Sequence, residues 1–277
     1  MFGRSSRLRR ALRSVVAWLG LGLMIVCFAW WQLSSKPQVA SAPPPTPPPK
    51  AELFSVVVLD PGHGGQDSGA MCAGILEKDL TLDIAQRLDR LLQSQGLATV
   101  MTRVGDAYVS LADRAALTNR VPNCVLVSIH FNEAGKAVSS SGIETYYPEH
   151  PIPVGAPLVS WLPFLQRAAA VTQAPDVESQ SLAGFVQEAL VVRTQSVNRG
   201  TKAKQFFVIA NVRHPAVLIE GGFLTNKEEI ARLASAEYRD QVAAAISEGV
   251  LRYREVKDQQ QRAFAATAAA PPPANNR

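Results

Sequence analysis

Three polar residues stand at the points where short hydrophobic runs of the sequence end. His63 follows the run VVVLDP, His130 follows VLVSI, and Glu220 follows AVLI. In open α/β sheets, ligands bind in the crevice beyond the carboxyl ends of the strands. If the three runs are neighbouring strands, these side chains share one edge of a sheet. Buried charged groups at such an edge need a partner or a metal ion.

A fourth residue, Glu77 in GILEKD, completes a set that can hold a metal ion. Two imidazoles, one carboxylate and an open fourth position are typical of a catalytic zinc site. Calcium and magnesium favour more carboxylates, and copper electron-transfer sites use a cysteine. The residue types therefore predict one zinc ion held by His63, Glu77 and His130. Glu220 would then take the proton of a zinc-bound water and pass it to a leaving nitrogen.

Each of these residues also has a plain structural explanation. A lone histidine after a strand is often a hydrogen-bonded turn residue, although the glycines around His63 favour a loop that presents a ligand. An acidic residue at a helix start, such as Glu77, is often there for the helix dipole. A buried Glu220 would on this view form a salt bridge to Arg103 or Arg114.

Strand-like and helix-like segments alternate between residues 53 and 254. This alternation predicts a single catalytic domain of the α/β class, with a twisted, mostly parallel central sheet covered by helices. The helix expected at 79–95 has one apolar face, with Gly96 at the position of a C-terminal cap. Ser110 is a typical N-cap for the helix expected through 117. Further helices are expected at 182–192, from 227 and from 236, and strands at 54–59, 97–102, 124–129, 142–147, 206–209 and 216–219.

The net charge of +5 comes from the arginines of segment 1–14, and the rest of the chain is formally neutral. The chain therefore lacks the basic footprint of a nucleic-acid-binding protein. Residues 15–33 are apolar over a length that can cross a bilayer, and the preceding arginines favour a cytoplasmic tail. The sequence predicts a transmembrane signal-anchor at 15–33. An A-x-A site at 40–42 leaves a cleaved signal peptide as the alternative.

Two low-complexity segments flank the domain. Residues 34–52 contain PPPTPPP, which predicts a stiff proline-rich linker. Residues 255–277 predict a disordered tail. Between them, Cys72 and Cys124 either form one disulfide or remain two thiols.

A proline-rich segment, 148–180, interrupts the alternation of strands and helices. It is longer than the connections that compact domains normally use. It predicts an inserted lid or regulatory segment, with an ornamental surface insertion as the alternative.

The ordered motifs of the domain resemble those of a known family. They run DPGHGGQDSGA, EKDLTLDIAQRLDRLL, TRVGD, LADRAALTN, VSIHFN, GIETYY, SLAGFVQEAL and NRGTKAKQFFVIANVRHPAVLIEGGFLTN, and they cover nearly all of 54–253. In content and order they resemble the zinc-dependent N-acetylmuramoyl-L-alanine amidases of bacterial cell-wall turnover. The matching positions imply zinc ligands at His63, Glu77 and His130, a catalytic carboxylate at Glu220, and a contact to the substrate or the zinc ligands at Asn132.

This resemblance implies an α/β fold, one zinc ion and hydrolysis of the amide between N-acetylmuramic acid and L-alanine in peptidoglycan. Such cleavage serves cell-wall remodelling or daughter-cell separation. In some relatives, an inserted helix at the place of 148–180 occludes the zinc until a partner protein displaces it. An activator protein acting on this segment is therefore expected, and Asp176 or Glu178 is a guess for a fourth ligand.

The resemblance and the flanking segments together predict a location in the cell envelope. We expect no separate wall-binding module, so the anchor in the cytoplasmic membrane and the linker would hold the domain in a periplasm. Two other functions stay open: a non-catalytic murein-binding scaffold, and a zinc hydrolase of soluble muropeptides.

Overall fold

The computed structural model describes residues 18–31, 53–133, 139–154 and 170–269. The chain divides into two units, residues 1–50 and residues 51–277. In the first unit, residues 18–31 form a helix. The other residues of the expected span 15–33, the basic segment 1–14 and the linker 34–52 lie outside the described residues.

The expected transmembrane helix lacks support in the fold. Within the four described ranges, no helix combines the length and the apolar character that crossing a membrane requires. The membrane anchor therefore stays a proposal and is not part of the described fold.

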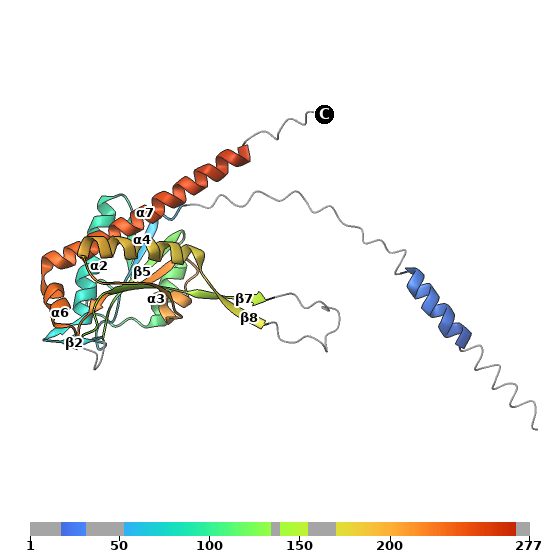
Figure 1. Cartoon of the computed structure of the whole chain (residues 1–277), viewed down its shortest axis with the longest axis horizontal. Coiled ribbons are helices and arrows are strands. Elements are labelled where there is room, and N and C mark those ends of the chain that lie inside the picture. Colours follow the sequence, from blue (N-terminus) through green and yellow to red (C-terminus); the bar gives the residue numbers. More distant parts are fainter. Residues whose placement is uncertain (1–17, 32–52, 134–138, 155–169, 270–277) are drawn as a thin grey trace, which may run out of the picture. The chain divides into compact units, whose positions relative to one another are not determined.

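A six-stranded sheet forms the centre of the second unit (Figure 1). The strand order is β4-β1-β5-β10-β6-β9, and neighbouring strands are parallel except β10 and β6, which are antiparallel. The expected α/β fold with a mostly parallel sheet is confirmed. The strands are β1 (Val56–Pro61), β4 (Ala98–Met101), β5 (Cys124–Asn132), β6 (Ile143–Tyr147), β9 (Asn198–Ala203) and β10 (Ala216–Phe223).

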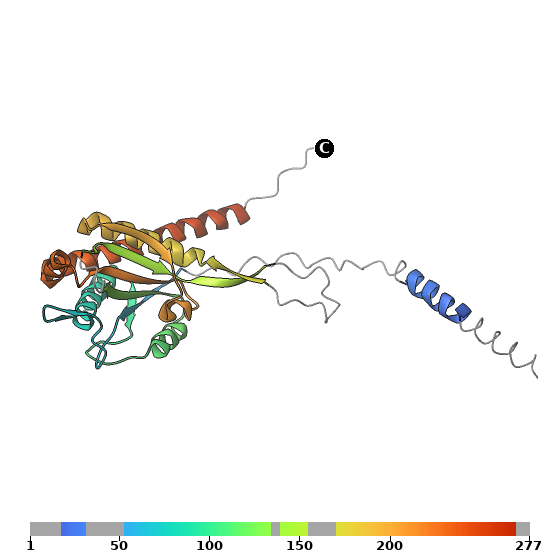
Figure 2. The same ribbon diagram turned by 60° about the horizontal axis from the view of Figure 1, so that its bottom comes forward.

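Helices cover both faces of this sheet (Figure 2). Successive side chains of a strand point to opposite faces, so Val57 and Leu59 join the larger hydrophobic cluster whereas Val58 joins the smaller one. Helices α2 (Glu77–Ser94), α4 (Val177–Thr194) and α7 (Ala236–Ala269) pack in the larger cluster, and α3 (Leu111–Arg120) and α5 (Phe207–Ala210) in the smaller one. The short helix α6 (Lys227–Ala234) contacts α7 and β10.

Local sequence explains where the early helices begin and end. The apolar face of α2 is fully buried at Ile84 and Leu88, and Gly96 follows the helix with φ of +79°, a conformation that glycine adopts at low cost. The helix begins at Glu77, earlier than the expected 79. Helix α3 begins as expected, because the Ser110 side chain accepts a hydrogen bond from the Asp113 backbone N–H.

Two elements differ from the sequence-based expectation. The apolar segment 206–209 is helix α5 and not a strand, because a run of four apolar residues carries too little periodicity to separate the two. Strand β9 was not expected, because NRGTKA has no apolar alternation. It lies at the edge of the sheet, where charged residues are common.

The expected disordered tail, 255–277, is wrong for residues 255–269, which continue helix α7. This stretch is rich in alanine and glutamine, which favour helix, and Arg262 pairs with Asp258 one turn before it at 2.7 Å. The cysteines are unpaired: Cys124 is buried and Cys72 is half-buried, so the alternative of one disulfide between them is wrong.

The segment 148–180 contains an antiparallel hairpin. Strands β7 (Glu149–Val154) and β8 (Ala170–Pro175), which follow β6 and precede α4 in the chain, pair with each other (Figure 1). Asp176 then caps α4 by accepting the backbone N–H groups of Glu178 and Ser179. The last residues of the expected insertion thus belong to α4. Its regulatory role is not tested by this geometry.

The contact between α4 and α7 depends on one glycine, which gives a test of the fold. A Cβ at buried Gly249 would lie 2.6 Å from the Val186 Cα, whereas a Cβ at exposed Gly184 on α4 would meet nothing within 4 Å. Gly249→Ala should therefore lower the free energy of unfolding by about 1–3 kcal/mol, as overpacking does. Gly184→Ala, its matched control, should raise it by up to about 1 kcal/mol through helix propensity. Urea unfolding followed by circular dichroism measures both, and equal effects would contradict the packing described.

Candidate active site

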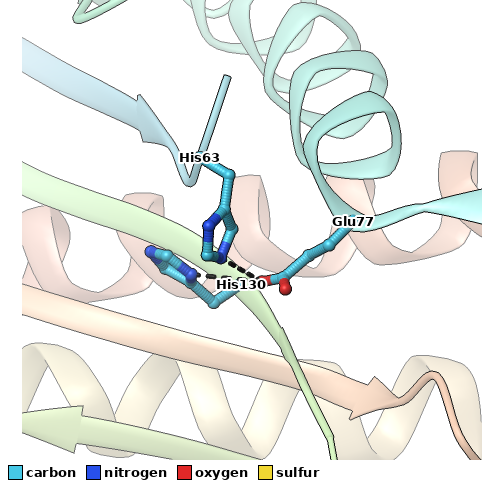
Figure 3. A group of neighbouring side chains, drawn as sticks. All are labelled: His63, Glu77 and His130. Atoms are coloured by element: carbon cyan, nitrogen blue, oxygen red, sulfur yellow. Dashed lines mark hydrogen bonds and ion pairs between the residues drawn. The ribbon is translucent and has the colours of Figure 1, made fainter. Parts of the chain in front are cut away.

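Side chains from three separate elements converge at the carboxyl edge of the sheet (Figure 3). The Glu77 Oε1 atom lies 3.0 Å from His63 Nε2 and 3.2 Å from His130 Nδ1. The two imidazole rings are 4.9 Å apart at an angle of 77°. One ligand atom from each residue falls within 4.8 Å of the others. The structure thus brings together the three residues predicted to bind metal.

This donor set fits a zinc ion. Zinc bonds of about 2.0–2.2 Å in tetrahedral geometry place neighbouring ligand atoms roughly 3.3 Å apart. The separations of 3.0 and 3.2 Å around Glu77 Oε1 are close to that spacing. Two nitrogens and a single carboxylate are too few oxygen donors for calcium or magnesium.

Two glycines make room for these ligands. A Cβ at Gly62 would lie 2.3 Å from the His130 Cε1, and a Cβ at Gly69 would lie 2.5 Å from the Glu77 Oε2. Any larger residue would displace a ligand. His63 itself has φ of +61°, an uncommon value for a residue with a side chain.

Glu77 is held as an anion. Its Oε2 accepts the backbone N–H of Ala70 at 2.9 Å, and its Oε1 accepts that of Phe131 at 3.0 Å. Burial alone would raise the pKa of Glu77, but His130 and His63 outweigh it and hold that pKa well below the usual range. The carboxylate is therefore ready to bind a cation.

A buried ion pair holds the loop that carries His63 in place. Arg114 Nη1 lies 2.7 Å from Asp60 Oδ1, with side-chain exposures of 3% and 1%. Arg114 also donates to the His63 carbonyl at 2.6 Å, while Thr102 and Ser128 donate to the Asp60 carboxylate.

Arg103 holds the same loop through backbone carbonyls, with no ion pair to an acid in the described part of the chain. Its guanidinium donates to the carbonyls of Pro61 at 3.0 Å and Gly62 at 2.8 Å. With Arg114 paired to Asp60, neither arginine forms the salt bridge to Glu220 that stood as the structural alternative.

Glu220 lies at the same edge of the sheet. It lies in register with His130 on β5 and with Glu144 on β6. Its Oε2 atom is buried and, among the described residues, has no hydrogen-bond partner. Burial first, and then repulsion from Glu77 and Glu144, raise the pKa of Glu220 to about 8. Such a carboxyl group is suited to exchange protons near neutral pH.

Glu144 is a site residue that the sequence analysis did not identify. Its Oε1 accepts hydrogen bonds from Asn132 Nδ2 and the Tyr146 hydroxyl, both at 2.9 Å. Arg199 and Lys202 of β9 bind its other oxygen. The motifs GIETYY and NRGTKA contained these charges, but no strand-end rule singled them out. Asn132 is thus placed beside the candidate site through Glu144, and its contact to a substrate stays a prediction.

Two guesses for a fourth ligand are wrong. Asp176 caps α4, and Glu178 binds the Tyr253 hydroxyl and Lys257 Nζ, each at 2.8 Å. Both acids therefore stabilise the start of α4 and its contact with α7. Another acid, Asp67, has its Oδ2 atom 2.9 Å from His63 Nδ1. This acid is suited to orient the imidazole ring.

Several known proteins resemble this chain. A family model described as N-acetylmuramoyl-L-alanine amidase matches residues 57–252. The chain is 34% identical over 197 residues to the N-acetylmuramoyl-L-alanine amidase LytC of Bacillus subtilis, covering 71% of this chain and 35% of that relative. The chain thus spans about a third of the length of this larger protein.

Solved structures show the same likeness. The N-acetylmuramoyl-L-alanine amidase from Clostridium difficile 630 matches with a TM-score of 0.62 and 35% identity, covering 74% of this chain and all of that one. The CwlD amidase from Clostridioides difficile, solved in complex with the GerS lipoprotein, matches with a TM-score of 0.60 and 26% identity. That match covers 73% of this chain and 99% of the CwlD chain.

The triad predicts that a metal ion needs both of its histidines, and His130 provides the test. His130→Ala removes one of three ligand atoms, so the variant should bind zinc more than about tenfold more weakly. The matched control is His214→Ala, because His214 lies outside the triad and is half-buried. Elemental analysis after dialysis should find about one zinc per chain in the wild type and the control, and little in His130→Ala. Wild-type zinc content in His130→Ala would contradict the assignment.

The facing carboxyl groups Glu220 and Glu144 should respond to pH in opposite ways when a chelator keeps the protein metal-free. The folded-state pKa of Glu220, about 8, lies above the ordinary 4.5, so its stabilising protonation is complete below 4.5 and is lost as pH rises through 8. Although burial opposes it, hydrogen bonds lower the pKa of Glu144 to about 2, so its contribution is present above 4.5 and is lost as pH falls through 2.

The test compares each glutamine variant with the wild type by urea unfolding. The stability of Glu220→Gln relative to wild type should rise between pH 5 and pH 8.5. Glu144→Gln should be less stable than wild type at pH 7, and this deficit should shrink below pH 4.5. Equal pH dependence for the two variants would show that the two environments do not differ as described.

Proposed function

The chain belongs to the N-acetylmuramoyl-L-alanine amidase family, and on this premise we propose that it cuts peptidoglycan with one zinc ion. The bond cleaved is the amide between N-acetylmuramic acid and the L-alanine of the stem peptide. The observation that carries the proposal is the convergence of His63, Glu77 and His130 beside Glu220, whose buried Oε2 atom has no hydrogen-bond partner among the described residues.

The side chains of the site have separate roles in the proposed reaction. His63, Glu77 and His130 would hold the ion. A zinc ion held there would supply Lewis-acid chemistry for the attacking water and the scissile carbonyl, and its charge would offset that of Glu77 near Glu220. Glu220 takes the proton from the attacking water and delivers it to the alanine nitrogen as the amide bond breaks.

The raised pKa of Glu220 suits both halves of this proton transfer. Its carboxyl group accepts a proton readily because burial disfavours the anion. It can return that proton because Oε2, among the described residues, has no hydrogen bond that would hold the group in one state. A carboxylate in a salt bridge to an arginine would be too weak a base for this role.

We also propose that the protein works in the cell envelope. The apolar stretch 15–33 behind its arginines supports an anchor in the cytoplasmic membrane with the domain in a periplasm, and cleavage after 42 is the alternative. The hairpin of β7 and β8 within 148–180 supports a contact with an activator protein. The binding of a lipoprotein by the CwlD relative supports the same idea.

Glu220→Ala should keep its zinc and lose at least about 100-fold in the release of stem peptides, because no other group takes the proton. Purified sacculi and free muropeptides are digested side by side, and mass spectrometry counts products with a free L-alanine N-terminus. Glu228→Ala, at an exposed glutamate of α6, is the matched control and should act like wild type. Full activity in Glu220→Ala would overturn the role, and preference for free muropeptides would redirect the substrate.

A further inference from the structure

A row of ionisable side chains crosses four neighbouring strands at the candidate metal site. His130, Glu220 and Glu144 are paired in register on β5, β10 and β6. Residues paired in register point to the same face of a sheet. Lys202 on β9 is in register with Tyr146 on that face and binds the Glu144 carboxylate. The row therefore runs from a metal ligand, over the proton-transfer group, to cations at the edge strand.

These cations outnumber the carboxylates around them. Arg199 and Lys202 share the one carboxylate of Glu144, and their side chains remain 35% and 42% exposed. The exposed Lys204 ammonium has no ion pair within the described residues: its Nζ lies 4.3 Å from the centre of the Phe206 ring, and its charge acts on Glu220. Three positive charges thus face one negative charge, on a surface open to a ligand.

The position of these cations differs from that of ordinary edge-strand lysines. Charged residues on edge strands prevent strand pairing between molecules when they point to solvent. Arg199 instead lies over the Phe223 ring at 5.0 Å, and Lys202 lies over Tyr146 at 5.9 Å. These ring contacts keep the two cations near Glu144. Their positive charge is therefore close to any ligand that binds over Glu220.

The direction of the substrate follows from the proposed reaction. His63 lies on the loop after β1, His130 lies on β5, and Glu220 lies on β10. Glu220 must reach the leaving nitrogen, so the alanine side of the scissile bond lies over β10. The stem peptide then continues towards β6 and β9, because the strand order is β5-β10-β6-β9.

The distance between the strands indicates which group of the stem peptide can reach the cations of β9. Strands lie about 4.8 Å apart, which places β9 roughly 10 Å from β10. A peptide advances at most about 3.6 Å per residue, so the second residue of the stem lies about 7 Å beyond the cleaved bond. In a stem peptide this residue is a glutamate linked through its side chain, and its free α-carboxylate lies within reach of a lysine or arginine.

We propose that Arg199, Lys202 and Lys204 form a binding site for the carboxylate of the second stem-peptide residue. This proposal rests on the proposed function. The site fixes the direction of the peptide across the sheet and disfavours substrates in which that carboxylate is amidated. Charge-assisted hydrogen bonds from these cations supply the preference.

The test uses two small substrates that differ in one group: N-acetylmuramoyl-L-alanyl-D-glutamate and its α-amide. The zinc-loaded wild type should cleave the carboxylate form with a kcat/KM about tenfold higher, mainly through KM, as expected for one charge-assisted contact. Lys204→Gln should bring this ratio close to one, and Lys204→Arg, which keeps the charge, should restore it. Lys227→Gln is the matched control, because Lys227 is an exposed lysine at the start of α6.

Two results would overturn the anion site: no preference in the wild type, or equal losses on both substrates in Lys204→Gln. Failure of the proposed function gives a different pattern, because the wild type would then cleave neither substrate nor sacculi. In that case, calorimetric titration of the same two ligands decides the anion site alone. Tighter binding of the carboxylate form, lost in Lys204→Gln, supports the site, and equal binding refutes it.

Discussion

The buried ion pair between Asp60 and Arg114 is the interaction on which the candidate site depends. A pair with exposures of 1% and 3% adds little net stability, because desolvation offsets most of the attraction. Its contribution is to position the loop that carries His63. Asp60 is the penultimate residue of the first strand, and Arg114 reaches from α3 to the carbonyl of His63. The two side chains therefore hold His63 in its uncommon backbone conformation, aimed at Glu77 and His130.

Three carboxyl groups at one edge of the sheet differ only in their partners. Glu77 remains an anion because two histidines and two backbone N–H groups surround it. Glu144 remains an anion because two cations bind it. Glu220 lies between these two anions, and burial and their repulsion raise its pKa because they outweigh the attraction of His63 and Lys204. The same type of side chain thus serves as a metal ligand at Glu77, as a partner for two cations at Glu144 and as a proton carrier at Glu220.

Much of this arrangement could be predicted from the sequence, because hydrophobic runs mark the strands and polar residues follow them. His63, His130 and Glu220 were found in this way, and the structure brings the two histidines together with Glu77. The partner of Asp60 could not be found, because Arg114 lies on a helix far along the chain and nothing local links the two. The strand predicted at 206–209 was wrong for another reason: four apolar residues fit a buried helical turn as well as a strand.

The search for polar residues at strand ends missed Glu144 because of the sheet topology. That search looks for polar residues after a strand, which is correct where neighbouring strands are parallel. Strand β6 runs antiparallel to β10, so its amino end, and not its carboxyl end, lies at the edge that carries Glu220. Glu144 therefore lies near the start of its strand, and β9, parallel to β6, brings Arg199 to the same edge near its own start. A single reversal of strand direction thus places the charges of two later strands opposite the metal ligands of two earlier ones.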